Sequence, residues 1–204
     1  MKLVILSPPN DYPDEHQVVC TILQQSSATF HLRKPGQTDR QIADYLKRVP
    51  VDLHPRIMVH GHPCLLEKFA LKGIHFTERQ RRRTPQTMRQ LRLAWPECLI
   101  SSAFHRLADI PEHDGCLDYI FLSPIFDSIS KKGYRAAFAC EDLKRWIAQT
   151  GHTVVALGGV DRRRVADAAA LGFTRVAVLG AVWASAWPAR AARQLSAICR
   201  RIEP

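Results

Sequence analysis

The chain has 204 residues, of which 46% are hydrophobic and 24% are charged, values that are ordinary for a globular domain and exclude a disordered or fibrous protein. No run approaches the roughly 18 apolar residues of a membrane span, and the apolar start of the chain is too short for the core of a signal peptide. The formal charge of +10 suits nucleic acid, phosphorylated substrates or a basic surface, but no nucleic-acid motif accompanies it.

The six cysteines are scattered, and no two of them form a C-x-x-C pair. Such spacing is typical of reduced thiols rather than of a disulfide framework or a redox motif. We therefore expect a cytoplasmic protein.

Short apolar runs alternate with helix-compatible segments along the whole chain. The predicted strands are Leu3–Leu6, Thr29–Leu32, Arg56–Val59, Gly73–Phe76, Cys98–Ser101, Tyr119–Leu122, Thr153–Leu157 and Arg175–Leu179. The predicted helices are Thr38–Val49, Pro63–Leu71, Pro85–Trp95, Cys140–Thr150, Arg162–Leu171 and Ser185–Ile202. This alternation indicates a parallel sheet with right-handed crossovers.

Two architectures fit that alternation, a closed barrel and an open doubly wound sheet. The open sheet usually carries a glycine-rich turn after its first strand, where this chain has Ser7-Pro8-Pro9-Asn10. No composition break divides the chain. We therefore predict an α/β protein that is a single (β/α)8 TIM barrel over residues 1–204.

The functional residues of such a barrel lie just beyond the C-terminal ends of its strands. At the second strand, alternation turns Phe30 and Leu32 toward the helices, and His31 and Arg33 toward the barrel interior. A buried arginine needs an anion or a carboxylate partner. Arg33 is therefore expected either to form an internal salt bridge or to bind an anion.

Histidines follow the third and fourth strands, at His60, His62 and His75. Three histidines at neighbouring strand ends raise the hypothesis of a metal site, but no second carboxylate or cysteine stands at ligand spacing. We predict hydrogen-bonding or acid–base roles for them, and no metal.

The segment after the sixth strand contains two hydroxyl groups, a cation and a glycine, at Ser128, Ser130, Lys131 and Gly133. Hydroxyl and ammonium groups donate hydrogen bonds to phosphate oxygens. The sequence therefore predicts that this segment surrounds a phosphate.

Glycines follow the last two strands, at Gly158 and Gly159 and then at Gly180, which precedes Ala181. Glycine lets backbone N–H groups approach an anion at a helix N-terminus. Because the loops after strands seven and eight form the recurrent phosphate site of this fold, we predict a second phosphate site there.

The densest positive charge is the run Arg79–Arg83. We interpret it as a solvated loop leading into a helix, since the interleaved aromatic residues of a single-strand binding surface are missing. Charge alone does not make this run part of a site.

Several motifs follow one another in an order that resembles the thiamine phosphate synthase and TenI family of barrels. They are Phe30–Lys34, Gly73–His75, Asp118-Tyr119, Ser123–Phe126 with Ser128-x-Ser130-Lys131, Ala156–Val160 and Ala177–Leu179. The resemblance spans nearly the whole chain. It implies a transferase that joins a hydroxymethylpyrimidine diphosphate to a thiazole phosphate and releases pyrophosphate.

The resemblance also implies roles for individual residues. The diphosphate would be held by Arg33, Lys34, Ser128, Ser130 and Lys131, with Arg33, Lys34 and Lys131 as the catalytic residues. The thiazole phosphate would be held by the backbone near Gly158, Gly159, Gly180 and Ala181. The substrate pocket would be lined by His31, His60, His75 and His105.

The chain departs from that family at the ligands of its Mg²⁺ ion. The synthases carry an Asn-Asp pair where this chain has His60-Gly61, and a further aspartate where it has Gln80. Mg²⁺ requires hard oxygen ligands, which histidine and glycine side chains do not offer. If Mg²⁺ binds, we expect substrate and water to hold most of its coordination sphere, or Arg79–Arg83 to offset the diphosphate charge in its place.

The tautomerases of the family use a histidine where this chain has Pro124. We therefore predict a transferase similar to thiamine phosphate synthase. The alternatives are a TenI-like thiazole tautomerase and a non-catalytic barrel that binds thiazole phosphate or thiamine phosphate. The expected partners are phosphorylated small molecules, and neither nucleic acid nor a membrane is expected. The sequence is compatible with a homodimer.

Overall fold

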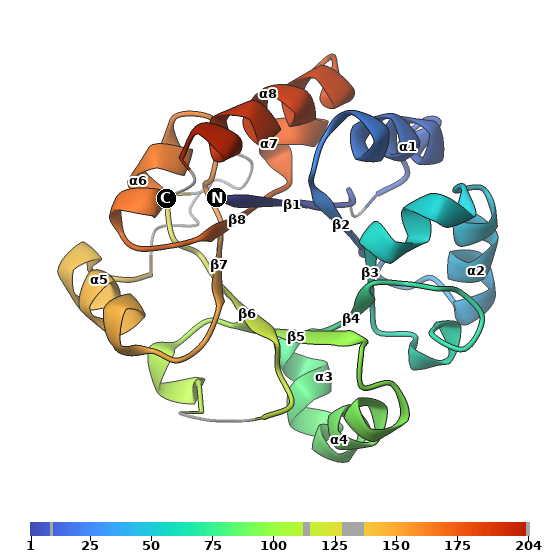
Figure 1. Ribbon diagram of the computed structural model, residues 1–204, viewed down its shortest axis with the longest axis horizontal. Helices are drawn as coiled ribbons and strands as arrows, with labels where there is room; N and C mark the ends of the chain where they lie inside the picture. Colours follow the sequence, from blue (N-terminus) through green and yellow to red (C-terminus); the bar gives the residue numbers. More distant parts are fainter. Residues whose placement is uncertain (9, 112–114, 128–136, 203–204) are drawn as a thin grey trace.

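The computed structural model describes residues 1–8, 10–111, 115–127 and 137–202. Its strands are β1 (Lys2–Leu6), β2 (Thr29–Leu32), β3 (Ile57–His60), β4 (Gly73–Phe76), β5 (Leu99–Phe104), β6 (Tyr119–Leu122), β7 (Val154–Leu157) and β8 (Arg175–Val178). Each strand pairs in parallel with the next, and β8 pairs with β1, so the sheet closes (Figure 1). The predicted (β/α)8 barrel is confirmed.

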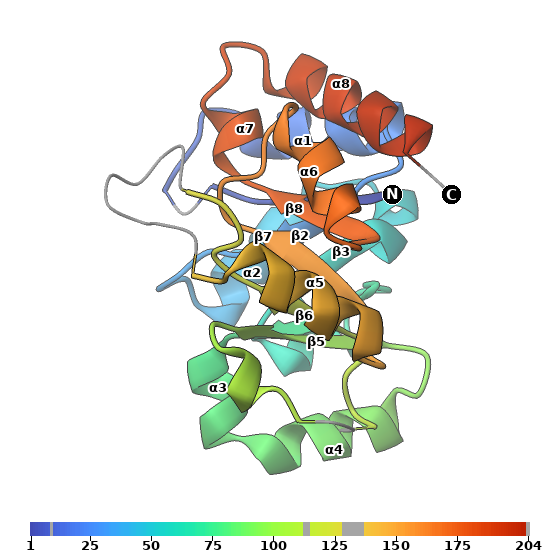
Figure 2. The ribbon, with the colours of Figure 1, turned by 90° about the vertical axis from the view of Figure 1, so that its left-hand side faces the viewer.

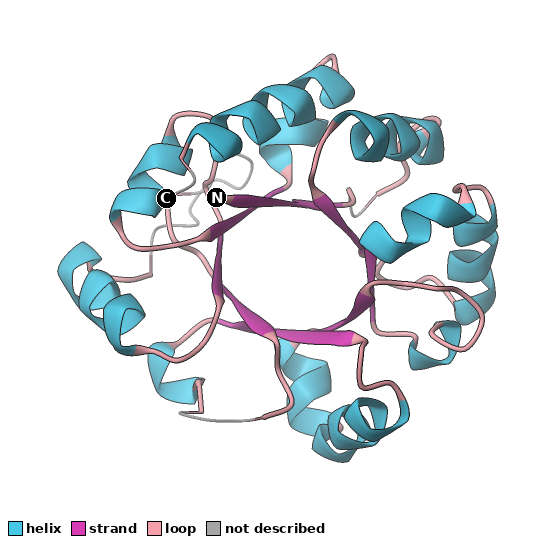
Figure 3. Cartoon of the chain, in the orientation of Figure 1, coloured by secondary structure: helices cyan, strands magenta, loops and turns pink. Residues whose placement is uncertain are grey.

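Helices form a ring outside the strands (Figure 3). The α-helices are α1 (Glu15–Gln25), α2 (Asp39–Lys47), α3 (Glu78–Arg83), α4 (Pro85–Ala94), α5 (Cys140–Gln149), α6 (Arg164–Ala170), α7 (Gly180–Trp183) and α8 (Pro188–Arg201). Three 3-10 helices are η1 (Val51–Arg56), η2 (Pro63–Leu65) and η3 (Leu107–Asp109). In the part of the chain that the structure describes, no helix is long and apolar enough to cross a membrane.

The strands separate two apolar regions. Phe30 and Leu32 of β2 face outward into the large core between strands and helices, as alternation predicts. A smaller inner core fills the barrel and includes Met58, Tyr119 and Phe121. The interior is therefore packed with side chains at this level rather than open, as is usual for this fold.

The two ends of the chain meet in this ring. Helices α1 and α8 lie side by side, which Figures 1 and 2 both show. The N-terminal ammonium group of Met1 donates a 3.0 Å hydrogen bond to the carbonyl of Cys199 in α8. These contacts fix β1 and α8 together and so close the barrel at its seam.

Local sequence signals explain several helix starts. Thr38 caps α2, and Gln41 completes the capping box predicted from their spacing. An equivalent box, formed by Thr77 and Gln80, starts α3. The run Arg79–Arg83 is therefore helical, and its interpretation as a loop was wrong.

The prediction of a helix over Pro63–Leu71 was also wrong, since only η2 and turns occur there. The backbone N–H of Lys72 already donates to Ile57 in the barrel ladder. A helix ending at Leu71 would leave no residue in which the chain could reverse direction before β4.

Helix α1 was not predicted at all. Its N-cap residue, Asp14, has a left-handed backbone and makes no side-chain capping bond, so the usual start signal is missing. The buried residues Val19, Ile22 and Leu23 do have helical spacing, and this was the signal available in the sequence.

Candidate functional site

A cavity of about 830 Å³ opens where the strands end. Residues from all parts of the barrel line it, including Leu6 of β1, Ala103 of β5 and Val178 of β8. The predicted location of the site, at the C-terminal ends of the strands, agrees with the position of this cavity.

Arg33 lines the cavity. Its backbone is fixed by a reciprocal pair of hydrogen bonds with Ser7, in which Arg33 N donates to Ser7 Oγ (2.7 Å) and Ser7 Oγ donates to the Arg33 carbonyl (2.9 Å). No ion pair joins its guanidinium to a carboxylate among the described residues. Of the two roles expected for Arg33, this arrangement favours anion binding over an internal salt bridge.

Lys34 does not take the position expected of it. Its ammonium group is buried, forms an ion pair with Glu15 of α1 and donates to the carbonyl of Pro8 at 2.9 Å. The Glu15 carboxylate also accepts from the Tyr45 hydroxyl, at 3.2 Å. Strand alternation explains the correction, because Lys34 follows the parity of Phe30 and Leu32 and so points outward, away from the cavity.

Helix α3 turns three arginines toward the cavity. Arg79, Arg82 and Arg83 line it, and their spacing of i, i+3 and i+4 places them on one face of the helix. Arg81 points elsewhere, with its guanidinium 3.9 Å from the centre of the Phe104 ring. These arginines are site residues that the sequence interpretation missed, and the Thr77-x-x-Gln80 capping box was the signal for their helical arrangement.

One carboxylate stands among these cations in the described lining, that of Glu78. It accepts from Arg82 at 2.6 Å, and its second oxygen lies 3.9 Å from Nε2 of His105. His105 lines the cavity as predicted, and its Nδ1 lies 3.0 Å from the carbonyl of Ser123. The cavity is therefore strongly cationic.

The predicted glycines also line the cavity, together with Ala181. Gly158 and Gly159 have φ values of +94° and +67°, which glycine adopts readily. A Cβ on Gly159 would lie 2.3 Å from the carbonyl oxygen of Asp127. The absence of a side chain at these residues therefore lets this turn pack directly against the backbone of Pro124, Phe126 and Asp127.

The floor of the cavity is made by histidines. His60 and His75 line it, while His31 lies deeper, in contact with the ring of Phe121 at a centroid distance of 4.9 Å. Nδ1 of His31 lies 3.0 Å from Nε2 of His60, and Nδ1 of His75 lies 2.8 Å from Oγ of Ser101. His62 is not part of this group, because its imidazole bonds to Asp39 instead.

These three rings are neutral. Burial lowers the pKa of His31 and His60 well below the usual value, with a smaller effect from His75, and it lowers the pKa of His75 to about 3, with a further contribution from the Arg33 guanidinium. At neutral pH they act as hydrogen-bonding groups rather than cations.

Mg²⁺ does not fit the described lining. Glu78 already accepts from Arg82, and Oε1 of Gln80 accepts from the backbone N–H of Thr77 at 2.9 Å. No pair of free carboxylates is left among these residues to bind the ion. Ser128, Ser130 and Lys131, which the sequence assigns to a diphosphate, lie outside the described residues.

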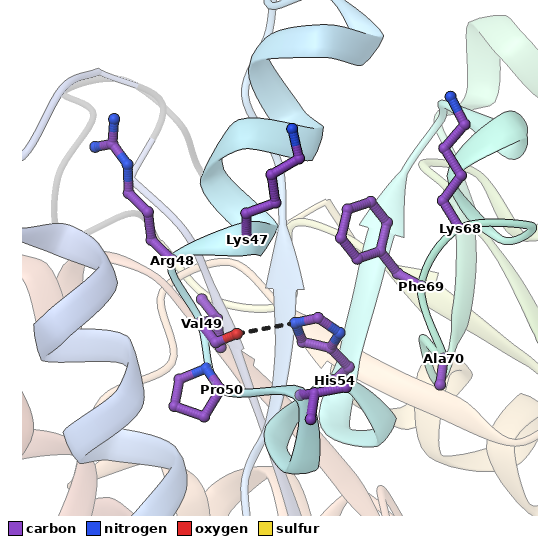
Figure 4. A pocket seen from close by; sticks show the side chains of 9 residues that line it. Lys47, Arg48, Val49, Pro50, His54, Lys68, Phe69 and Ala70 are labelled. Carbon is purple, nitrogen blue, oxygen red and sulfur yellow. Dashed lines mark hydrogen bonds between the residues drawn. The ribbon is translucent and has the colours of Figure 1, made fainter.

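A second cavity, of about 620 Å³, lies beside the C-terminal end of α2 and is lined by residues that include the cations Lys47, Arg48 and Lys68 (Figure 4). Their side chains extend in roughly the same direction, and their charged ends do not converge on a common point. Nε2 of His54 donates a 3.1 Å hydrogen bond to the carbonyl of Val49. This arrangement does not form one anion site.

A closed parallel barrel with a cationic cavity bordered by glycine is the architecture of a phosphate-binding (β/α)8 protein. A family model described as thiamine monophosphate synthase matches residues 3–182. The chain therefore belongs to the thiamine monophosphate synthase and TenI family, as its motifs predicted.

Individual relatives agree with this. A thiamine-phosphate synthase of Chlamydia caviae is 23% identical over 208 residues, which cover 98% of this chain and 95% of that protein. A thiamine-phosphate synthase of Archaeoglobus fulgidus is 30% identical over 86 residues, so that the match spans 42% of this chain and 41% of that protein. The structure of thiamine phosphate pyrophosphorylase from Pyrococcus furiosus shares the fold, with a TM-score of 0.81, 16% identity and coverage of 100% and 97%.

Proposed function

We propose that the protein is a thiamine phosphate synthase-like transferase, joining hydroxymethylpyrimidine diphosphate to thiazole phosphate with release of pyrophosphate. Family membership supports the reaction class. The observation that carries the proposal is the charge of the cavity, whose described lining has four arginines and one carboxylate. A diphosphate leaving group needs such an excess of positive charge.

In this reaction the bond between the pyrimidine methylene carbon and the diphosphate oxygen breaks first. The electron pair leaves with pyrophosphate, and the thiazole nitrogen then donates its own pair to the pyrimidine cation to form the new carbon–nitrogen bond. The arginines would offset the charge that develops on the leaving oxygens. Because their positions are fixed before reaction, they stabilise the transition state without reorganising.

The chain's own groups divide between the two substrates. Arg33 and the α3 arginines would hold the diphosphate, joined by Ser128, Ser130 and Lys131 as the family resemblance implies. The backbone at Gly158, Gly159, Gly180 and Ala181 would hold the thiazole phosphate. Holding both in one cavity brings the attacking nitrogen to the reacting carbon.

The departure from the Mg²⁺ ligands gives a second candidate, a barrel that binds thiazole phosphate or thiamine phosphate without catalysis. It is favoured by the engagement of Glu78 with Arg82, which leaves no free carboxylate pair in the described lining. The arginine-rich lining would then serve binding alone.

One assay separates these functions. Purified protein is mixed with both synthase substrates, with and without Mg²⁺, and thiamine phosphate and pyrophosphate are followed by chromatography. Formation of both products is expected, and their absence under every condition would refute the transferase. Exchange between thiazole tautomers without pyrophosphate would indicate a TenI-like isomerase, and saturable binding with neither reaction would indicate the non-catalytic barrel.

A further inference from the structure

Three imidazoles from consecutive strands meet inside the barrel, His31 of β2, His60 of β3 and His75 of β4. One ring nitrogen from each lies within 4.8 Å of the others. The closest pair, Nδ1 of His31 and Nε2 of His60, is separated by 3.0 Å, and the rings of His60 and His75 are 4.2 Å apart. Two nitrogens bound to one tetrahedral zinc ion at 2.0–2.1 Å are about 3.3 Å apart, so small ring movements would admit an ion.

The remaining nitrogens of two rings are already oriented by the protein. Nε2 of His31 lies 2.8 Å from the Tyr119 hydroxyl, and Nδ1 of His75 lies 2.8 Å from Oγ of Ser101. If these nitrogens carry the protons, Nδ1 of His31 and Nε2 of His75 present lone pairs. Metal-bound histidines are usually held in this way, with the far nitrogen hydrogen-bonded to the protein.

His60 supplies the third ring. Its Nδ1 is buried and has no hydrogen-bond partner among the described residues. No hydrogen bond from that side therefore fixes the tautomer of His60. With the proton on Nδ1, Nε2 of His60 would present a lone pair, and the ion would take the place of its hydrogen bond to Nδ1 of His31.

We propose that His31, His60 and His75 form a site for one zinc ion or a similar borderline transition-metal ion. Three neutral imidazoles match the preferences of such an ion and not those of Mg²⁺. His60 and His75 line the cavity, so the fourth coordination position opens into it.

The charges around the three rings define that fourth ligand. The Arg33 guanidinium lies close enough to disfavour a positive charge on His60 and His75, and the Lys72 ammonium has the same effect on His31. These cations oppose a divalent ion, so an anionic fourth ligand, hydroxide or a phosphate oxygen, is needed to offset them. The site does not depend on the proposed reaction, because the ion binds whether or not the protein is a transferase.

Metal titration of the full chain tests the proposal. After treatment with EDTA, the protein is titrated with Zn²⁺ by calorimetry and with Co²⁺ by visible absorption, which reports a four- or five-coordinate site. One ion per chain is expected. His60→Gln and His75→Gln should each weaken binding at least about 100-fold, since loss of an outer-shell partner alone costs 10–100-fold.

Ser101→Ala and Tyr119→Phe remove the hydrogen-bond partners of His75 and His31. Each leaves the three histidines in place and should weaken the ion about 10–100-fold. Circular dichroism of each variant shows whether it folds. For the unmodified protein, zinc X-ray absorption should show three imidazole nitrogens at about 2.0–2.1 Å, a readout that needs no variant.

His62→Gln is the matched control, because His62 stands two residues from His60 but bonds to Asp39, which also accepts from the thiol of Cys64. Zn²⁺ affinity should be unchanged in this variant. Loss of binding in His62→Gln would place the ion at the Asp39–His62–Cys64 group and overturn the proposal. Absence of binding to the unmodified protein, or fewer than three nitrogens around the zinc, would overturn it too.

Discussion

Nδ1 of His31 and Nε2 of His60 lie 3.0 Å apart inside the barrel, so one of the two nitrogens donates a proton and the other accepts it. This contact requires at least one of the two rings to be neutral, because two imidazolium ions would present only donors to each other. It joins β2 to β3 beneath the cavity, and His75 of β4 completes the group.

The neutrality of these histidines predicts a pH-dependent stability in the metal-free protein. The folded state keeps His75 unprotonated down to about pH 3, whereas the unfolded chain takes up a proton near the ordinary pKa of 6.5. The stability is therefore complete above pH 6.5 and is lost as the pH falls from 6.5 toward 3. The loss is about 1.4 kcal/mol per pH unit for each such histidine.

Urea unfolding at pH 7, 6 and 5 in EDTA measures this slope. His75→Gln removes one titrating group, so its free energy of unfolding should fall less steeply with decreasing pH. His152→Gln, at a half-buried histidine that bonds to the carbonyl of Pro111 and lies apart from the three barrel histidines, is the control. Equal slopes for His75→Gln and the unmodified protein would contradict the prediction.

Arg33 and Lys34 are neighbours with different expected functions. Arg33→Gln should weaken the binding of inorganic pyrophosphate by about 10-fold or more, since a hydrogen bond to a charged group contributes about 1.5–3 kcal/mol. Calorimetric titration with pyrophosphate measures this. The unfolding free energy of Arg33→Gln should stay close to that of the unmodified protein.

Lys34→Met should show the opposite pattern. It leaves the buried Glu15 carboxylate without its ammonium partner, which typically destabilises a protein by about 3–5 kcal/mol. Pyrophosphate affinity of the folded variant should be retained. Adding Glu15→Met should recover most of the stability, and failure to do so would refute the ion pair as the cause.

The α3 arginines should act through charge at the cavity. Arg79→Gln and Arg83→Gln should each weaken pyrophosphate binding by about 2–5-fold, as expected for partly screened charges, and the difference should shrink at high salt. Arg162→Gln removes an arginine that bonds to Gln194 of α8 instead. An equal effect of Arg162→Gln would mean that net charge, not position, controls binding.

Gly159 should tolerate no side chain. In Gly159→Ala the new Cβ would meet the Asp127 carbonyl oxygen at 2.3 Å, so the backbone must move and the phosphate affinity of the cavity should fall. Gly36→Ala is a matched control, with φ of +84° and nothing within 4 Å of the added Cβ. It should cost about 1 kcal/mol of unfolding free energy and leave phosphate binding intact, whereas Gly159→Ala should cost more than about 2 kcal/mol.

Lys131→Ala should abolish the binding of pyrophosphate, because the sequence assigns its ammonium group to the diphosphate. Titration calorimetry with pyrophosphate measures the effect, and thermal unfolding shows whether stability is retained. Unchanged affinity would count against the diphosphate-binding role of the segment that contains Ser128, Ser130 and Lys131.

The strands and their inward or outward faces were predictable because both are local properties. All eight strands start within one residue of their predicted positions, and β5 extends beyond the prediction to Phe104. The same alternation that places Phe30 outward also places Lys34 outward. That assignment was available in the sequence, but the resemblance to a family motif outweighed it.

Helix boundaries were less predictable where the signal was not local. The segment after His62 has helix-compatible composition, yet the short distance to β4 leaves room for a 3-10 turn alone. In α3, by contrast, the Thr77–Gln80 capping box is a local signal in the sequence. It predicts a helix for the basic run that was interpreted as a solvated loop.

The sequence by itself determined the barrel, the glycines at the ends of β7 and β8, and the identity of the family, because strand periodicity, turn residues and motif order are properties of the chain read along its length. Only the tertiary structure decided which side chains meet. Parallel pairing of the consecutive strands β2, β3 and β4 brings His31, His60 and His75 together, whereas His62 bonds to Asp39 instead. Such contacts depend on strand register and backbone direction, which no local pattern specifies.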